Sequence, residues 1–208
     1  METLINEQRL NLACGQNRVE GYFGIDIKPG DTVDAVVDLE QYPWPIESES
    51  AEEIICYHYI EHIPHDNLAK VLLKIMTSAE SLEDMKKMAV EVFENMPSDG
   101  FFQFMDEVYR ILKPGGKLKI IAPYYSSIRA WQDPTHQRAI NEACFLYLNK
   151  DWREANKLSH YNVKADCDFV YGYDVVNEWA TRNEEARSTA IKNYNNVAND
   201  IHVTLTKK

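Results

Sequence analysis

Short apolar segments alternate with longer segments of helical periodicity along this chain. The short segments predict strands at residues 10–13, 22–27, 35–37, 53–57 and 117–122, and two alternating segments predict later strands at 168–173 and 201–205. Apolar residues at helical spacing predict helices at about 68–76, 82–96 and 104–112, and a polar helix lies near 183–194. The pattern is typical of an α/β fold with a doubly wound, mostly parallel sheet of seven strands.

Turn residues and spacing refine this outline. Lys113-Pro114-Gly115-Gly116 predicts the end of the third helix and a tight turn. Only residues 16–23 separate Gly15 from Gly24, whereas a full crossover through a helix needs about 10–12 residues, so we expect a loop or a single turn there. Residues 66–100, with a break at Pro97-Ser98-Asp99-Gly100, are expected to form a helical insertion in a single domain of 208 residues.

Composition excludes several classes of protein. The 22 basic and 33 acidic residues give a net charge of −11, which disfavours non-specific binding to nucleic acid. No run of 18 apolar residues predicts a membrane span, and the first residues lack the pattern of a secretory signal. The four cysteines form no CxxC pair, which argues against a zinc knuckle or a disulfide scaffold and favours a reducing, cytoplasmic location.

Ligands of open α/β sheets bind outside the carboxyl ends of the strands, so the residues that follow each strand are the candidate cofactor site. These are Ala13, Cys14, Gly15, Gln16, Asp26, Ile27, Asp38, Leu39, Tyr57 and His58. A dinucleotide motif starting at Gly15 would need glycine at positions occupied by Asn17 and Glu20, so a nicotinamide dehydrogenase is the weakest hypothesis. A nucleoside without phosphate fits better: Gly15 permits close approach, Asp26 can accept ribose hydroxyl protons, and Asp38 can accept from an adenine amine.

Four motifs in this order resemble the class I methyltransferases that use S-adenosylmethionine (SAM). They are Leu10-Asn11-Leu12-Ala13-Cys14-Gly15, Gly21-Tyr22-Phe23-Gly24-Ile25-Asp26-Ile27, His58-Tyr59-Ile60-Glu61-His62-Ile63 and Tyr109-Arg110-Ile111-Leu112-Lys113-Pro114-Gly115-Gly116. The resemblance implies SAM as cofactor and adds His62 to the residues beside it. The short first crossover departs from the family and implies a more open cofactor pocket.

The segment after the fifth strand carries the candidate catalytic residues. The resemblance extends to an Asp-Pro-Thr-His-x-Arg loop, in which His136 is the candidate general base, Asp133 its orienting group and Arg138 an anchor for an anionic substrate. Tyr125 is a further catalytic candidate, and Tyr124 and Trp131 are candidates for substrate binding. The alternative is a loop that only hydrogen-bonds to itself.

His58, His62 and His65, with Glu61 between them, are of the residue types that bind metal ions. The spacing of His58 and His62 suits zinc ligands on a helix, but the H-E-x-x-H order is absent and Pro64 lies nearby, so we expect no metal.

The sequence therefore predicts SAM-dependent methyl transfer to an oxygen or nitrogen atom of a small molecule, a sugar or a peptide group. The alternative is a catalytically silent SAM-fold module that acts through a partner. Met76, Met85, Met88 and Met96 of the insertion are expected to fill a core, or else to cover the substrate or form a homodimer face.

Overall fold

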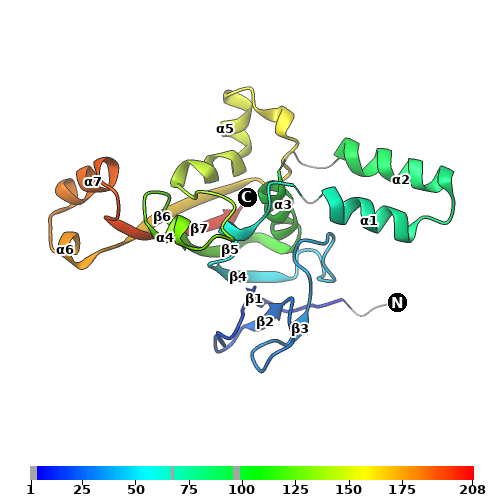
Figure 1. Cartoon of the computed structure of the whole chain (residues 1–208), viewed down its shortest axis with the longest axis horizontal. Helices are drawn as coiled ribbons and strands as arrows, with labels where there is room; N and C mark the ends of the chain where they lie inside the picture. Colours follow the sequence, from blue (N-terminus) through cyan, green and yellow to red (C-terminus); the bar gives the residue numbers. More distant parts are fainter. Residues whose placement is uncertain (1–3, 67, 96–98) are drawn as a thin grey trace.

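The chain forms one mixed β-sheet with helices in its connections (Figure 1). A computed structural model describes residues 4–66, 68–95 and 99–208. Within these ranges the strands are β1 (Arg9–Leu12), β2 (Phe23–Asp26), β3 (Ala35–Val36), β4 (Ala51–Tyr57), β5 (Leu112–Pro123), β6 (Cys167–Val175) and β7 (Ala198–Lys207). Their order is β3-β2-β1-β4-β5-β7-β6; β7 pairs antiparallel with β5 and with β6, and the other neighbouring strands pair in parallel. The predicted seven-stranded, mostly parallel sheet is confirmed.

The helices occupy three connections of the sheet. After β4 come the 3-10 helix η1 (Ile60–His62) and the helices α1 (Leu68–Ser78), α2 (Leu82–Asn95) and α3 (Gly100–Ile111). After β5 come α4 (Arg129–Gln132), η2 (Glu142–Leu148), α5 (Lys150–Ala155) and η3 (Ser159–Tyr161). Two helices, α6 (Asn177–Ala180) and α7 (Glu184–Asn193), join β6 to β7. The elements between β5 and β6 are short and carry little periodicity, which is why the sequence pattern missed them.

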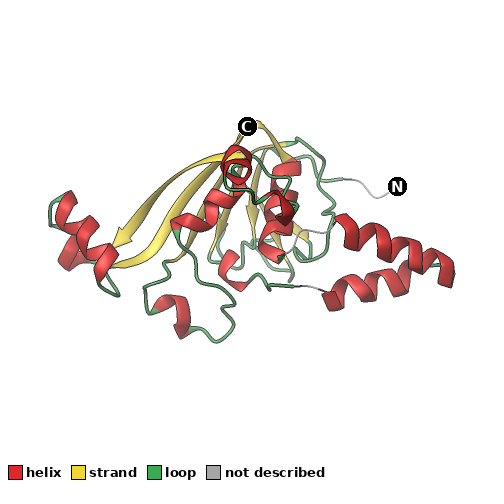
Figure 2. Cartoon of the chain, turned by 90° about the horizontal axis from the view of Figure 1, so that it is seen from above, coloured by secondary structure: helices red, strands yellow, loops and turns green. Residues whose placement is uncertain are grey.

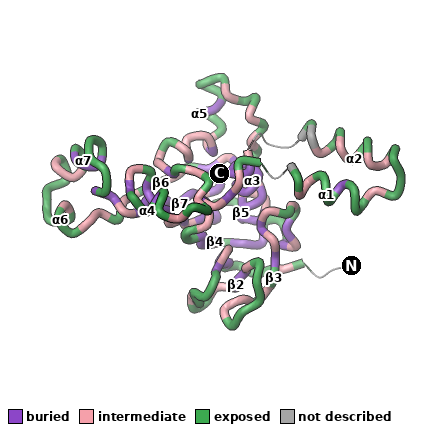
Figure 3. The backbone as a smooth tube through the Cα atoms, viewed as in Figure 1, coloured by how far each residue is buried: buried purple, intermediate pink, exposed green. Residues whose placement is uncertain are grey.

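One face of the sheet packs against the core. Figure 2 shows the larger helices on one side of the strands, where α3 and η2 bury aromatic side chains such as Phe104 and Phe145. Alternate strand residues on this face are fully buried, while Arg9, Lys117 and His202 on the opposite face are exposed. Burial therefore concentrates in the central strands and α3 (Figure 3). The face that carries Arg9, Lys117 and His202 is polar and exposed to solvent, as is common for a sheet face that is not covered by helices.

The first crossover is a loop, as its length predicts. Residues 13–22 contain turns and no helix, and β1 and β2 pair in parallel through this short connection. Gly24 of β2 lies against the next connection, where a Cβ atom would come 2.2 Å from the carbonyl oxygen of Thr32. Glycine is required here because the two backbones touch. The loops consequently leave the carboxyl ends of β1 and β2 open to solvent.

The region expected to be an insertion contains two antiparallel helices. The helices α1 and α2 form a hairpin that extends away from the sheet (Figure 1). Met96 and the Pro97-Ser98 part of the expected break lie outside the described residues. Leu73 and Met76 of α1 are exposed, whereas Ile75 is buried. The hairpin thus carries apolar side chains on its free surface as well as on its packed one.

Two further expectations concern the turn and the cysteines. The predicted turn at 113–116 is an irregularity inside β5: Leu112 and Lys117 pair with Ala51 and Glu53 of β4, so the residues between them bulge outward. Gly115 takes φ +77° in this bulge.

All four cysteines are free, as expected. Across the described ranges, none of the helices has the length and apolar character needed to cross a membrane.

Candidate functional site

The carboxyl ends of β1 and β2 meet at Gly15 and Asp26. The backbone N–H of Gly15 donates to Oδ2 of Asp26 at 2.9 Å, and the N–H of Lys28 donates to Oδ1 at 3.1 Å. Gly15 takes φ +53° and has no neighbouring atom within 4 Å of where a Cβ would lie. The carboxylate is therefore held in place while each oxygen keeps a lone pair, and the space beside Gly15 is open to a ligand.

The other predicted cofactor residues after β1 and β2 differ in exposure. Ala13 adopts φ +53°, and the N–H of Cys14 continues the sheet by donating to the Ile25 carbonyl at 3.1 Å. Cys14 is buried, and burial raises the pKa of its thiol. Gln16 and Ile27 are exposed beside the Gly15 loop. Cys14 thus supports the loop, whereas Gln16 and Ile27 are accessible to a ligand.

After β3, Asp38 lies at the ligand edge but is already paired. Its carboxylate accepts hydrogen bonds from the N–H of Glu40 at 3.0 Å and from Nζ of Lys70 at 3.1 Å. Burial opposes ionisation, but the hydrogen bonds from Glu40, Gln41 and Lys70 outweigh it and hold the pKa of Asp38 below its usual range. Lys70 lies on α1, and the sequence analysis did not identify it. A ligand amine would therefore compete with this lysine for Asp38.

Leu39, the neighbouring candidate, belongs to the core. Its side chain is buried, and its carbonyl accepts a hydrogen bond from Nε1 of Trp44 at 3.2 Å. Because the Leu39 side chain is buried, this arrangement disfavours a direct contact between it and a ligand.

The end of β4 presents Tyr57 and His58. Tyr57 is exposed, and His58 takes φ +54° with its N–H donating to the Ile121 carbonyl at 2.8 Å. Nδ1 of His58 lies 3.5 Å from Oε1 of Glu61. The Glu61 carboxylate beside this ring raises the pKa of His58.

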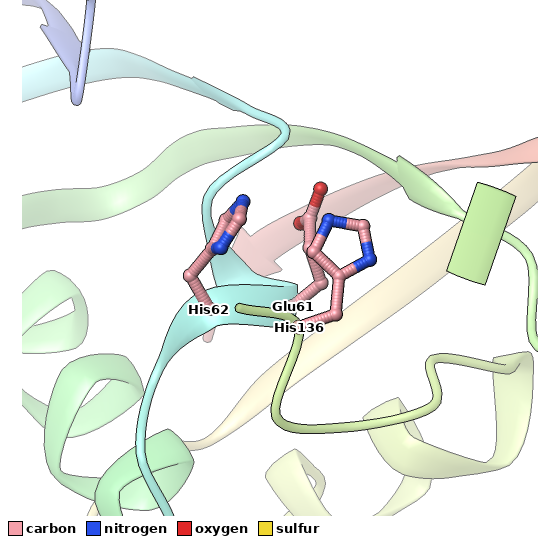
Figure 4. A group of neighbouring side chains, drawn as sticks. All are labelled: Glu61, His62 and His136. Atoms are coloured by element: carbon pink, nitrogen blue, oxygen red, sulfur yellow. The ribbon is translucent and has the colours of Figure 1, made fainter. Parts of the chain in front are cut away.

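Glu61, His62 and His136 form a cluster at the same edge (Figure 4). One potential ligand atom from each residue lies within 4.8 Å of those of the other two. The two imidazole rings lie edge to face, with their centroids 4.6 Å apart. Glu61 and His62 come from η1, and His136 comes from the loop after α4. The Glu61 side chain is only 2% exposed, and neither of its oxygens has a hydrogen-bond partner among the described residues.

Hydrogen bonds fix the tautomers of both histidines. Nδ1 of His136 lies 2.9 Å from the Ala130 carbonyl, which can only accept, so this nitrogen carries the proton. Nδ1 of His62 lies 3.0 Å from Oγ1 of Thr135, whose own proton is donated to Asp133 at 2.7 Å. His62 is therefore the donor to Thr135. Both rings keep the Nε2 lone pair for another partner.

Asp133 has a different neighbour from the one the sequence suggested. Its carboxylate accepts from both the N–H and the hydroxyl of Thr135, and these hydrogen bonds hold the pKa of Asp133 below its usual range. The ring of His136 is oriented by the Ala130 carbonyl instead. Asp133 thus acts on His62, through Thr135. The Asp-Pro-Thr turn motif was the only sequence signal that could have placed Thr135 here.

Arg138 lies in a buried network. Its guanidinium donates to the Ile63 carbonyl at 2.9 and 2.8 Å, to the Pro64 carbonyl at 2.9 Å and to Asp99 at 2.8 Å. It also lies over the ring of Phe101, with its side chain 10% exposed. These contacts use four of the five N–H donors of the guanidinium, and Arg138 also borders the cavity that Trp131 lines.

The remaining candidates lie on the segment that follows β5. Tyr124 is buried, and its hydroxyl donates to Glu142 at 3.2 Å, while Tyr125 and Trp131 are exposed. Trp131 borders a cavity of about 650 Å³ with a largely aromatic wall, lined also by His65, Phe102, Gln137, Tyr147 and Tyr161. This volume suits a small organic ligand next to the loop that carries His136.

Comparison with known proteins finds likeness in structure. No protein-family model matches the chain, and no curated protein matches it. A SAM-dependent methyltransferase from Archaeoglobus fulgidus is 14% identical with a TM-score of 0.54, over 97% of this chain and 86% of that one. A SAM-dependent methyltransferase from Mesorhizobium loti is 9% identical with a TM-score of 0.46, over 100% and 94%.

A third solved structure is longer than this chain. Phosphoethanolamine N-methyltransferase 2 from Haemonchus contortus, in complex with SAM, is 13% identical with a TM-score of 0.43, and the match covers 99% of this chain but 50% of that one. The strand order and the likeness to the Archaeoglobus structure, which extends over most of both chains, identify the fold. The chain therefore has the fold of the class I SAM-dependent methyltransferases, the family that its sequence motifs resemble.

Proposed function

We propose that this protein transfers a methyl group from SAM to an oxygen or nitrogen atom of a small molecule, a sugar or a peptide group. The observation that carries the proposal is the joined pair of Gly15 and Asp26 at the ligand edge of a methyltransferase fold. Asp26 keeps one lone pair on each oxygen for the two ribose hydroxyls, and Gly15 leaves room for the ligand beside the backbone.

The adenine end of the cofactor is assigned to Asp38. Its carboxylate can accept from an amine, provided that the ligand displaces or shares the contact with Lys70. Lys70 belongs to the α1–α2 hairpin, so cofactor binding and the position of this hairpin are expected to be coupled.

The transfer itself is an in-line displacement at the methyl carbon, in which placing the acceptor and the methyl group supplies about 7–11 kcal/mol of the barrier. An acceptor hydroxyl or ammonium must also lose a proton, and Nε2 of His136 is the proposed base because its lone pair is unused. The acceptor is expected to enter past Trp131 from the adjoining cavity.

Thermal unfolding with and without SAM or S-adenosylhomocysteine tests cofactor binding. Ligand at 100 times its Kd adds about 2.7 kcal/mol of stability, roughly 5–10 °C in Tm for a chain of this size. The shift should vanish in Asp26→Ala and in Gly15→Ala. Gly115→Ala is the matched control, because Gly115 also has positive φ with free space around it but lies in the β5 bulge. A shift that persists in Gly15→Ala and Asp26→Ala would refute the assigned site.

A partner-binding module is the second candidate function, and exposed apolar side chains on the α1–α2 hairpin favour it. Leu72, Leu73, Met76 and Val90 are 41%, 61%, 64% and 56% exposed. Exposed apolar side chains gathered on one hairpin can mark a protein contact, including one with a second copy of the chain. This alternative would be favoured if the protein binds SAM but transfers no methyl group to any acceptor class, and if His136→Gln leaves SAM binding unchanged.

A further inference from the structure

The buried carboxylate of Glu61 lacks the partners that such a group needs. Its side chain is 2% exposed and neither oxygen accepts a hydrogen bond within the described part of the chain. Nδ1 of His58 approaches Oε1 at 3.5 Å as an ion-pair partner. Buried carboxylates are normally hydrogen-bonded, paired or bound to a metal, so this group is aimed at a partner that the chain itself only partly supplies.

The two histidines beside Glu61 are arranged as metal ligands are. Each donates its Nδ1 proton to an oxygen, His136 to the Ala130 carbonyl and His62 to the Thr135 hydroxyl. Metal-bound histidines typically donate their second ring nitrogen in this way, which fixes the tautomer and turns the lone pair of the other nitrogen toward the ion. Figure 4 shows the side chains of His62 and His136 on either side of the Glu61 carboxylate.

We propose that Glu61, His62 and His136 bind a divalent transition-metal ion, with Zn²⁺ as the best fit. Two imidazoles and one carboxylate are a ligand set of catalytic zinc sites, which keep a fourth position for water or substrate. The three donor atoms lie within 4.8 Å of one another. Ligands at 2.0–2.1 Å in a tetrahedral site are about 3.3 Å apart, so side-chain rotations of modest size close the site. Imidazole ligands favour zinc over Mg²⁺ or Ca²⁺.

This site differs from the one that sequence spacing suggested. His65 faces away from the cluster, with Nδ1 bound to Asp99 at 2.9 Å and Nε2 at 3.1 Å from the Gln137 carbonyl. His136 takes its place because the N–H groups of Gln137 and Arg138 bind the Glu61 carbonyl at 2.7 and 3.3 Å and hold the two segments together. The local sequence around Glu61 could not show that His136, which is far along the chain, lies beside it.

The proposed ligands come from η1 and from the loop after α4, whereas the Gly15–Asp26 pair lies at the ends of β1 and β2. A bound ion would occupy the Nε2 lone pair that the proposed base uses, so His136 has one role or the other in a given molecule. In the metal-bound form the ion would lower the pKa of an acceptor hydroxyl placed in the open position.

Isothermal titration of the chelator-treated 208-residue protein with Zn²⁺ tests the site directly, without a methyl-transfer assay. We expect one Zn²⁺ per chain and no comparable binding of Mg²⁺. His136→Gln and Glu61→Gln should each weaken binding by at least about 100-fold, and Thr135→Ala by about 10–100-fold, because Thr135 only orients His62. His160→Gln is the matched control, since His160 is exposed on η3 outside the cluster.

Three results would overturn the proposal: no Zn²⁺ binding, equal binding in His136→Gln, or binding that is lost in Cys144→Ser, which would place the ion on a free thiol. Circular dichroism confirms that each variant is folded before titration. Should Glu61→Gln not fold, His136→Gln still decides, because that ring is only partly buried on a loop. Absence of Zn²⁺ binding with an intact SAM-dependent thermal shift would refute the metal site alone.

Discussion

Replacement of Arg138 by methionine separates a structural role for this residue from a role in substrate binding. The guanidinium holds the carbonyls of Ile63 and Pro64 and the carboxylate of Asp99 at 2.8–2.9 Å. Asp99 is also the N-cap of α3, accepting from the N–H of Phe101 at 2.7 Å. The methionine keeps an unbranched apolar chain over Phe101 but removes every donor. The segment that carries Glu61 and His62 would lose this link to α3 and would keep the hydrogen bond from the N–H of Gly100 to the His65 carbonyl.

The expected loss of stability is about 3–5 kcal/mol, the usual cost of breaking a largely buried ion pair from one side. Asp99 and two carbonyls would lose a charged donor, and hydrogen bonds to charged groups contribute about 1.5–3 kcal/mol each, so the estimate lies below their sum. His65 remains bonded to Asp99 and limits the loss. For a chain of this size the change corresponds to a decrease in Tm of roughly 6–20 °C.

Urea denaturation followed by circular dichroism measures this change, with Arg182→Met as a control at an exposed position. The midpoint should fall strongly in Arg138→Met and stay within about 0.5 kcal/mol of the parent in Arg182→Met. An unchanged midpoint in Arg138→Met, together with an increased KM for an anionic acceptor, would refute the structural role and restore the predicted anion anchor.

Three further substitutions test separate parts of the fold. Burial raises the pKa of Asp106 to about 6, above its unfolded value of about 3.9. The protonated carboxyl therefore contributes stability that is fully present below about pH 4 and is lost as the pH rises through about 6. Asp106→Asn should flatten the stability between about pH 4 and 7 and raise it at pH 7 by up to about 3 kcal/mol; a parallel pH profile would contradict this. Lys207→Met removes the donor to the Leu112 and Tyr109 carbonyls, which lie 2.7 and 2.9 Å from Nζ. The free energy of unfolding, measured by urea denaturation, should fall by about 2–3 kcal/mol. An unchanged midpoint would show that these carbonyls find other partners. Asn183→Ala removes the N-cap of α7 and should cost about 1 kcal/mol and speed amide exchange in its first turn; unaltered exchange would count against the cap.

The sheet was the most predictable part of the molecule. Each predicted strand overlaps one of β1 to β7, because period-two or continuous apolar patterns in short segments depend on neighbours along the chain. The loop between Gly15 and Gly24 followed from its length alone. The elements between β5 and β6 were missed because η2 and η3 are 3-10 segments without amphipathic periodicity.

The candidate site was predictable where topology alone brings residues together. Parallel strands end at one edge, so Gly15 and Asp26 could be placed there from sequence, and a hydrogen bond joins them in the structure. Leu39 and Arg138 could not be assigned in the same way. Whether a side chain faces the ligand or the core depends on packing in the folded chain. Leu39 is buried beside Trp44, and Arg138 is held by Asp99, which is far from it in the sequence.

The sequence by itself determined the α/β class, the strand positions and the residues that follow each strand, because local hydrophobic patterning and turn chemistry specify them. Only the tertiary structure decided which side chains meet at the ligand edge. Lys70 reaches Asp38 from the hairpin, and His136 joins Glu61 and His62 from a loop far along the chain. Such contacts arise from the docking of whole segments through backbone hydrogen bonds and core packing, and local periodicity carries no information about that docking.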